Sequence, residues 1–238
     1  MIPVTKGNEP IELKELRESV KNEGLTPKNE FMLLRNPQKS KVLHALKRDQ
    51  GQLCVYCMCT IPREDKDRGI PGETIEHYIP LSPKDGRNVG QALDYQNLFA
   101  VCHGNTKAHC RGERRASSEE TLTCDKHRHE TEFLKIDPLD PETLKSITYS
   151  LDGRIDATDP DVRYDLVETL NLNCEASPLI GERKAALDSL IDLIGAEIGK
   201  ESFFPSCTKL LEGFRNETDP KTPYVGILIW YLQDMIKE

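Results

Sequence analysis

Cysteine and histidine side chains concentrate in one part of this 238-residue chain. The window from Cys54 to His129 holds six of the eight cysteines and five of the six histidines. Cys54 and Cys57 are separated by two residues, which is the spacing of a zinc knuckle, and later thiols can complete a tetrahedral site. The window therefore predicts a structural zinc.

A second kind of chemistry begins at Glu76 and His77 in the same window. Hydrolysis of a phosphodiester needs a cation on the phosphate and a base for the attacking water, and a histidine with a pKa of about 6.5 suits the second role. Neighbouring side chains on a strand point to opposite faces, so both residues reach one phosphate only if a hairpin wraps around it. A helix packed across that hairpin, bringing His103 or Asn105, would complete the cation site.

The net charge of −8 is unevenly distributed. Residues 1–50 carry +3, residues 51–130 carry −1 and residues 131–238 carry −10, counting Lys and Arg against Asp and Glu. The last segment repels a polyanion, so we expect phosphate contacts from the front of the chain and from cations around the cysteine window. The acidic last third is either a docking surface for a protein or only a solvated surface. The cationic candidates in the window are Lys107, Arg111, Arg114, Arg115, Lys126 and Arg128.

Residues 1–10 lack an apolar run behind a basic start, so no secretory signal is expected. The longest apolar run, Tyr224 to Leu232, is far shorter than the ~20 residues that span a bilayer. These features predict a cytoplasmic protein with no membrane partner. Cytoplasmic thiols bind metals or pack in the core rather than form disulfides, and we expect Cys174 and Cys207 to be core residues.

Apolar spacing and turn residues predict an α+β fold. We expect a strand at 74–77, after an exposed loop at 62–72 and before a turn at 82–86. Residues 96–101 can form a helix or a second strand, and residues 147–155 read as a β-hairpin with an Asp-Gly turn. The expected helices are 11–20, 40–50, 160–170, the one-sided stripe from Leu187 to Ile198, and a last helix after Pro223.

Several of these fragments occur together in one known family. The chain resembles the HNH endonucleases of ββα-metal fold in four fragments: Cys54-Val-Tyr-Cys57, Ile75-Glu76-His77-Tyr78-Ile79-Pro80, Asp94-Tyr95-Gln96-Asn97-Leu98 and Cys102-His103-Gly104-Asn105. A longer set resembles the HNH subunit of Septu-type and retron-associated anti-phage systems. That set adds Cys124-Asp125-Lys126-His127, Asp137-Pro138, the Asp-Gly hairpin and Leu170-Asn171-Leu172-Asn173. The resemblance covers the chain from Cys54 to about Arg183.

The resemblance implies an α+β fold in which a ββα-metal HNH core with a structural zinc lies between N- and C-terminal helical regions. It divides the chain into a helical segment at 1–50, the nuclease core with its zinc knuckle at 51–135, and a hairpin plus helical region at 136–238. The last region is the expected docking part for a partner.

Site residues follow position by position. His77 matches the general base of the family, and Glu76 matches the acidic metal ligand before it. Asn97 matches an asparagine that in many members ties the hairpin together. Asn105 lies where related nucleases place a second metal ligand, and His103 is the competing candidate.

The zinc pattern departs from the second Cys-x-x-Cys of many HNH proteins, because Asn105 follows Cys102 at that spacing. The expected thiols are therefore Cys54, Cys57, Cys102 and Cys124, and Cys110 is the alternative to Cys124. Cys59 is separated from Cys57 by one residue, too close for comfortable shared chelation, so we expect it to be a bystander.

The implied cofactors are Zn²⁺ in the structural site and Mg²⁺ or another divalent cation in the catalytic one. The implied partners are a nucleic acid, an ABC or SMC-like ATPase subunit, and a reverse transcriptase with its RNA–DNA product. The residues leave open whether DNA or RNA, for example tRNA, is the substrate. The main alternative is a non-catalytic, zinc-stapled adaptor. A zinc deaminase is disfavoured because it needs histidine before glutamate, and the order here is reversed.

Overall fold

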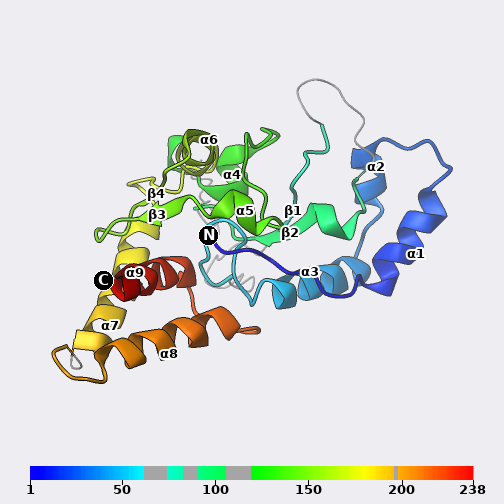
Figure 1. The fold of residues 1–238 in the computed structure, drawn as a ribbon. Coiled ribbons are helices and arrows are strands. Elements are labelled where there is room, and N and C mark those ends of the chain that lie inside the picture. Colours follow the sequence, from blue (N-terminus) through cyan, green and yellow to red (C-terminus); the bar gives the residue numbers. More distant parts are fainter. Residues whose placement is uncertain (62–73, 83–90, 106–118, 196–197, 238) are drawn as a thin grey trace, which may run out of the picture.

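The computed structural model describes residues 1–61, 74–82, 91–105, 119–195 and 198–237. The fold is mixed α+β: two short antiparallel strand pairs lie among helices, as the sequence predicts (Figure 1). The predicted loop at 62–72 lies outside the described residues, as does the predicted turn from residue 83 onward. The α-helices are α1 (Ile11–Val20), α2 (Pro27–Met32), α3 (Gln38–Asp49), α4 (Cys124–Arg128), α5 (Pro141–Leu144), α6 (Pro160–Tyr164), α7 (Leu179–Gly195), α8 (Phe203–Asn216) and α9 (Val225–Lys237).

The first strand pair carries the residues with candidate chemistry. Strand β1 (Thr74–His77) has the predicted bounds and pairs antiparallel with β2 (Leu98–Val101), with His77 opposite Leu98. Both alternatives for residues 96–101 occur in part, because a single 3₁₀ turn, η1 (Tyr95–Asn97), leads directly into β2. Another 3₁₀ turn, η2 (Glu119–Thr121), precedes α4.

Helix α3 packs on β2 and brings the chain to the first cysteines. The predicted start at residue 40 is two residues late, because the helix begins at Gln38. The buried Gln50 amide at its end donates to the carbonyl oxygens of Ala100 (2.7 Å) and Leu53 (2.8 Å), and its oxygen accepts from the Ala100 N–H at 2.8 Å. This one side chain thereby pairs with both backbone polar groups of Ala100 in β2.

The second strand pair is the predicted hairpin, with β3 (Ile147–Tyr149) against β4 (Ile155–Ala157). Gly153 in its turn has a φ of +90°, which side chains rarely adopt. A Cβ there would also lie 2.3 Å from the carbonyl oxygen of Ile180 in α7. The glycine therefore allows the hairpin to pack closely on α7.

The predicted helix at 160–170 is α6 followed by a π-helical turn, η3 (Asp165–Thr169). The predicted stripe from Leu187 to Ile198 is wrong at its end, because α7 stops at Gly195 and Ile198 is 67% exposed. The last helix starts at Val225, after Tyr224 with a φ of 57°. Helix α9 packs against α7, α8 and β3.

Buried apolar side chains from all three predicted segments belong to one cluster, which includes Leu46, Phe99 and Ile227. Cys174 and Cys207 are buried, as predicted for core residues. Helices α1 to α3 lie on one side of the first strand pair and α7 to α9 on the other (Figure 1). Among the described helices, none has both the length and the apolar character that a bilayer crossing needs.

Candidate functional site

Four buried cysteines converge from three parts of the chain. Cys54 and Cys57 follow α3, Cys102 follows β2, and Cys124 is the first residue of α4. Their four sulfur atoms lie within 4.8 Å of one another. Tetrahedral zinc with Zn–S bonds of about 2.3 Å keeps its sulfurs about 3.8 Å apart. The Sγ atom of Cys102 is 3.8 Å from those of both Cys57 and Cys124, so the set fits a structural metal such as zinc.

Cys124 therefore joins the cluster as predicted, and the alternative Cys110 lies outside the described residues. Cys59 is not a member of the group of four, but it is half-buried beside it, with its Sγ 3.4 Å from that of Cys57. The expected bystander is thus a close neighbour of the cluster.

A tight turn at Gly104 places the chain after Cys102 against Thr123, the residue before Cys124. The φ of Gly104 is +56°, and a Cβ would lie 2.4 Å from the carbonyl oxygen of Thr123. The Gly104 N–H donates to Cys102 Sγ at 3.4 Å, and its carbonyl accepts from Thr123 N at 3.0 Å. The turn thereby brings the chain before α4 against the end of β2, which sets Cys124 beside Cys102.

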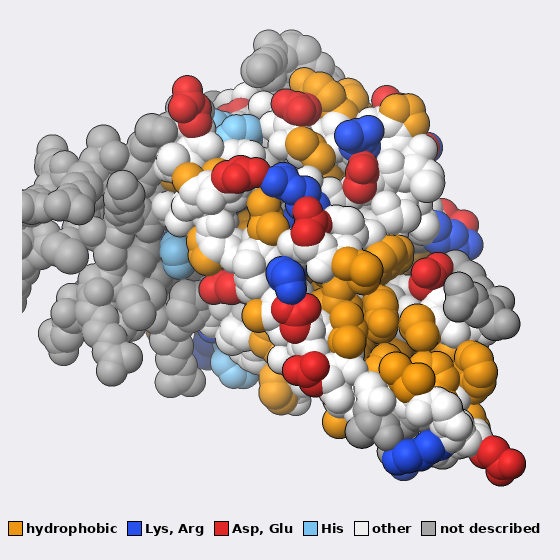
Figure 2. All heavy atoms as spheres, turned by 90° about the vertical axis from the view of Figure 1, so that its left-hand side faces the viewer, with side chains coloured by type: hydrophobic (Ala, Val, Ile, Leu, Met, Phe, Trp, Pro, Cys, Tyr) orange, Lys and Arg blue, Asp and Glu red, His pale blue; other side chains and the backbone are white. Residues whose placement is uncertain are grey.

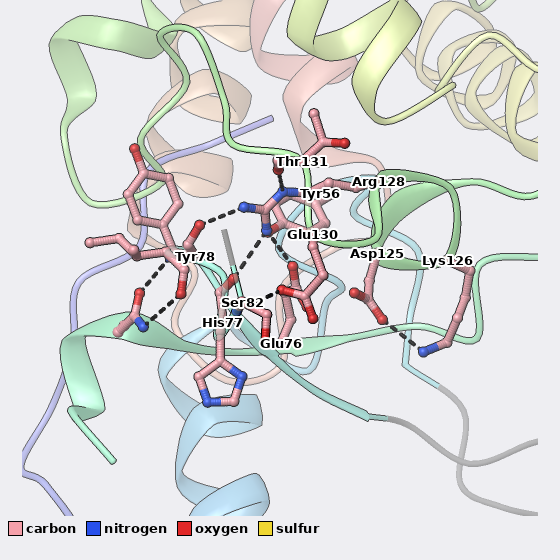
Figure 3. Close-up of polar contacts among 12 residues, drawn as sticks. Tyr56, Glu76, His77, Tyr78, Ser82, Asp125, Lys126, Arg128, Glu130 and Thr131 are labelled. Carbon is pink, nitrogen blue, oxygen red and sulfur yellow. Dashed lines mark hydrogen bonds and ion pairs between the residues drawn. The ribbon is translucent and has the colours of Figure 1, made fainter. Parts of the chain in front are cut away.

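A cavity of about 260 Å³ opens next to the start of α4. Residues from β1 and α4 face each other across it (Figure 3). Its lining combines three acidic side chains, two histidines and one lysine, which is a composition suited to cation binding and proton transfer. The lining residues are Glu76, His77, Pro80, Leu81, Asp125, Lys126, His129 and Glu130.

Arg128, at the end of α4, is 1% exposed and pairs with Glu76 through Nη1 (Figure 3). Its guanidinium also lies 4.2 Å from the ring centre of Phe133. All of its hydrogen bonds are internal, so the expectation that Arg128 contacts phosphate is wrong; its role is to orient the Glu76 carboxylate. The other acceptors are Tyr56 Oη and the carbonyl oxygens of His77, Tyr78 and Thr131, at 2.5 to 3.2 Å.

Glu76 and Asp125 behave as a carboxylate pair. Burial and the hydrogen bond with Asp125 raise the pKa of Glu76 well above its ordinary value, against the opposing effect of Arg128. Burial acts to raise the pKa of Asp125 as well, but the hydrogen bond from Glu76 and the charge of Lys126 lower it overall. The hydrogen bond between the two carboxyl groups thus acts in opposite directions on their pKa values, raising that of Glu76 and lowering that of Asp125.

His77 is 7% exposed and its ring is fixed on two sides. Nε2 lies 3.0 Å from the carbonyl oxygen of Ala92, and the Phe31 ring of α2 meets the imidazole edge to face, with 4.5 Å between ring centres. A carbonyl only accepts, so Nε2 carries the hydrogen and Nδ1 of the neutral ring has the free lone pair. Burial lowers the pKa of His77, which favours this neutral form.

Asn97 has the contacts of a structural residue. It is 3% exposed; its side-chain oxygen accepts from Ile79 N at 2.6 Å, and its nitrogen donates to the carbonyl oxygens of Ile79 (3.1 Å) and Gln91 (3.2 Å). These bonds hold the chain after β1 to the chain before β2. They agree with the expectation that Asn97 ties the hairpin together.

Asn105 and His103 line a different cavity, which also contains Cys59 and Glu182. The Asn105 amide donates to the carbonyl oxygens of Thr121 (2.7 Å) and Ala176 (3.4 Å). The described structure thus does not bring Asn105 to the lining of the Glu76 cavity, and Asp125 lies beside Glu76 instead.

The other cationic and histidine candidates divide into two groups. Lys126 lines the Glu76 cavity and pairs with Asp125 at 2.7 Å, whereas His127 Nδ1 lies 3.1 Å from the carbonyl oxygen of Thr169 and has a structural contact. His129 also lines the cavity. Outside the described residues lie Lys107, His109, Arg111, Arg114 and Arg115.

Sequence reasoning missed Asp125 as a partner of Glu76 and Phe31 as a neighbour of His77. Asp125 had a usable signal, because it directly follows Cys124 and a zinc ligand at the start of a helix fixes the next side chain in space. Phe31 had none, since its contact with His77 joins residues 46 positions apart.

No family model matches the chain, and no curated protein matches it.

Replacing Arg128 with methionine should lower the free energy of unfolding by about 3–5 kcal/mol, because Glu76 loses its buried partner and several carbonyls lose a donor. Lys126→Met is the matched control, since this side chain is 32% exposed and its ion pair is worth at most about 1 kcal/mol. Urea unfolding of both variants measures the difference. Adding Glu76→Gln to Arg128→Met should recover part of the loss. Equal midpoints for the two single variants would contradict the buried-pair interpretation.

Proposed function

We propose that this chain is a metal-dependent endonuclease of the HNH type that hydrolyses phosphodiester bonds of a nucleic acid. The observation that carries the proposal is the meeting of Glu76, His77 and Asp125 at one cavity beside the cysteine cluster. A carboxylate pair and a neutral imidazole are the groups that cation-assisted hydrolysis requires.

The arrangement of β1, β2 and α4 supports a ββα-metal core. Strand β1 supplies Glu76 and His77, α4 supplies Cys124 and Asp125, and Cys102 directly follows β2. Asp125 directly follows Cys124, so a zinc on the cysteines would fix the start of α4 and with it the second carboxylate. In this proposal Asp125 takes the position that the family resemblance assigns to Asn105.

His77 is the proposed general base. Its Nδ1 accepts the proton of the attacking water, while the Ala92 carbonyl holds Nε2–H and Phe31 limits rotation of the ring. The lowered pKa keeps the ring unprotonated before the reaction. The ring is therefore ready to accept a proton at neutral pH.

Glu76 and Asp125 are the proposed ligands of a divalent cation, with Mg²⁺ as the first candidate because it binds through one or two carboxylates. When bound, such an ion supplies positive charge to the scissile phosphate and to the leaving oxygen. Arg128 keeps the Glu76 carboxylate aimed at the cavity. Lys126, which pairs with Asp125 at 2.7 Å and lines the same cavity, would contact a phosphate oxygen bound there.

The proposal is tested with Glu76→Gln and Asp125→Asn, incubated with duplex DNA, single strands and total tRNA over a range of Mg²⁺ and Mn²⁺. Both variants should lose at least about tenfold in cleavage, with recovery at higher metal concentration, because each removes one charged ligand. Calorimetric titration with Mn²⁺ should show weaker binding. Asp192→Asn, an exposed acid of α7, is the control. Unchanged cleavage and unchanged metal dependence in Asp125→Asn would refute its role.

We further propose, from the family resemblance, that the chain is the effector of a bacterial anti-phage complex. Its proposed partners are an ABC or SMC-like ATPase and, in some systems, a reverse transcriptase with its RNA–DNA product. Apolar side chains on the face of α7, α8 and α9 support a docking role for the C-terminal region (Figure 2). Leu193 is 60% and Phe204 51% exposed. Co-purification of the full chain with a co-expressed ATPase tests the partner.

The competing proposal is a non-catalytic adaptor. The same apolar face would bind the partner of an adaptor, but an adaptor would not need the Glu76, His77 and Asp125 side chains at one cavity. Protection of cells by a Glu76→Gln, His77→Gln double variant at the wild-type level would favour the adaptor.

A further inference from the structure

Helices α2 and α3 meet at a strongly cationic stretch of the chain. Residues 21–50 contain seven Lys and Arg and three Asp and Glu. Some of these cations are engaged: Lys41 pairs with Glu12 at 2.5 Å, and Arg48 with Asp49 at 2.7 Å. Lys47 is buried. Within the described residues no acidic partner lies against the three that remain, which we call the basic corner: Lys28, Arg35 and Lys39.

The basic corner adjoins the candidate base through Phe31. The Lys39 ammonium lies 5.5 Å from the centre of the Phe31 ring, and the same ring is 4.5 Å from the centre of the His77 imidazole. Lys39 is therefore within about 10 Å of the His77 ring, which corresponds to roughly three phosphates along one strand of a duplex at about 3.4 Å of axis each. Lys28 is in the same short helix as Phe31, and both Lys28 and Arg35 are exposed.

The charge distribution in the rest of the chain also favours binding of the substrate at the basic corner. Residues 131–238 carry −10, of which −7 lies in residues 131–175, whereas residues 21–50 carry +4. A polyanion is repelled by the acidic segment and attracted at the basic corner. Glu23 and Glu30 are the acids of the α2 region, and they reduce the local charge without cancelling it. Lys126 supplies a cation within the cavity itself.

We propose that the basic corner binds the backbone phosphates that flank the scissile bond, so that the nucleic acid runs over α2 and the start of α3 into the Glu76–His77 cavity. This inference rests on the proposed endonuclease function. Lysine and arginine contacts to phosphates position a nucleic acid without reading its sequence. The corner therefore supplies affinity and register for DNA and RNA backbones alike, and discrimination between them must come from other surfaces.

The test is binding of a fluorescent 20-base-pair DNA duplex, and of an RNA duplex of the same sequence, to the full zinc-loaded chain in the absence of Mg²⁺, so that no cleavage occurs. The variant Lys28→Glu, Arg35→Glu, Lys39→Glu is compared with Arg163→Glu, Lys184→Glu, Lys209→Glu. All three control positions are exposed and lie in the C-terminal half. Both variants change the net charge by the same amount, so only the position of the charges differs.

We expect the corner variant to raise the dissociation constant at least about tenfold at 0.1 M salt, and the control to stay within about threefold. The slope of log affinity against log salt should also fall by about 2 to 3 in the corner variant, because about three phosphate contacts are lost. A milder variant with glutamine at the three corner positions should fall between these, which guards against misfolding of the glutamate variant. Zinc content and circular dichroism should match the wild type.

Two results would overturn the inference, and only the second also overturns the proposed function. If the wild type binds and cleaves nucleic acid, and the corner and control variants weaken binding equally, the corner is not the contact surface and the proposed function stands. If the wild type binds neither duplex and cleaves no nucleic acid with Mg²⁺ or Mn²⁺, the proposed function falls and the inference falls with it. Loss of binding to the DNA probe alone in the corner variant would assign the corner to DNA.

Discussion

His77→Ala should lower the rate of phosphodiester cleavage by about 10²–10⁴-fold, the usual contribution of a general base. The imidazole is the proposed proton acceptor of the Glu76 cavity, where its Nε2 is held by the Ala92 carbonyl. Cleavage of a labelled substrate at saturating Mg²⁺ measures the effect. Zinc content should stay at the wild-type value, because His77 does not belong to the cysteine cluster.

A second substitution separates chemistry from packing. Alanine removes a buried ring that contacts Phe31 and Ala92, so it also costs some stability. Glutamine keeps an N–H donor for the Ala92 carbonyl and much of the volume, but its amide cannot accept a proton at neutral pH. His77→Gln should therefore be as inactive as His77→Ala and more stable. A glutamine variant that cleaves at the wild-type rate would refute the base assignment.

The thiol cluster and the two strand pairs could be predicted because their signals are local. The Cys54 and Cys57 spacing, the strand at 74–77 and the Asp-Gly turn at 152–153 are each set by a few neighbouring residues, and the structure has all three. The four-thiol set could also be predicted. Once Cys54, Cys57 and Cys102 are assigned, only Cys59, Cys110 and Cys124 remain in the window.

Long-range contacts limited the prediction of the hydrolytic site. Whether Asp125 or Asn105 lies beside Glu76 depends on where α4 packs against β1, and the sequence signal for that packing is the position of Asp125 directly after Cys124. Arg128 looked like a surface cation because its sequence neighbours are polar, but five internal acceptors surround it in the fold. A charged residue is seldom buried without such partners, and four of the five partners come from segments about 50 to 70 positions away.

At Ile198 the prediction failed for a different reason: it extended a regular apolar pattern beyond the end of the helix. Its spacing continues the apolar stripe of α7, but the helix ends at Gly195 and the side chain is exposed. Gly195 is a poor helix former, and Gly199 has a φ of +80°, so the chain turns here although the apolar spacing continues.

Cys124→Ser should abolish stoichiometric zinc binding and unfold the centre of the protein at ordinary temperature. Structural zinc supplies about 10–16 kcal/mol of apparent binding free energy in small zinc domains, comparable to the whole stability of a typical domain of about 5–15 kcal/mol. A hydroxyl is a poor replacement for a thiolate, so one lost ligand removes much of that contribution. Zinc per chain and the thermal midpoint are the measurements, and Cys54→Ser should behave in the same way.

Cys207→Ser is the matched control, because Cys207 is fully buried in α8 and is not a member of the cluster. It should keep one zinc per chain and lose only the modest stability of a polar substitution in the core. Cys110→Ser should also keep its zinc. If instead Cys110→Ser loses the metal and Cys124→Ser retains it, the fourth ligand is Cys110. Asp125 would then no longer be fixed by the neighbouring zinc ligand, and the proposed pairing of Asp125 with Glu76 on a catalytic cation would lose its main structural support.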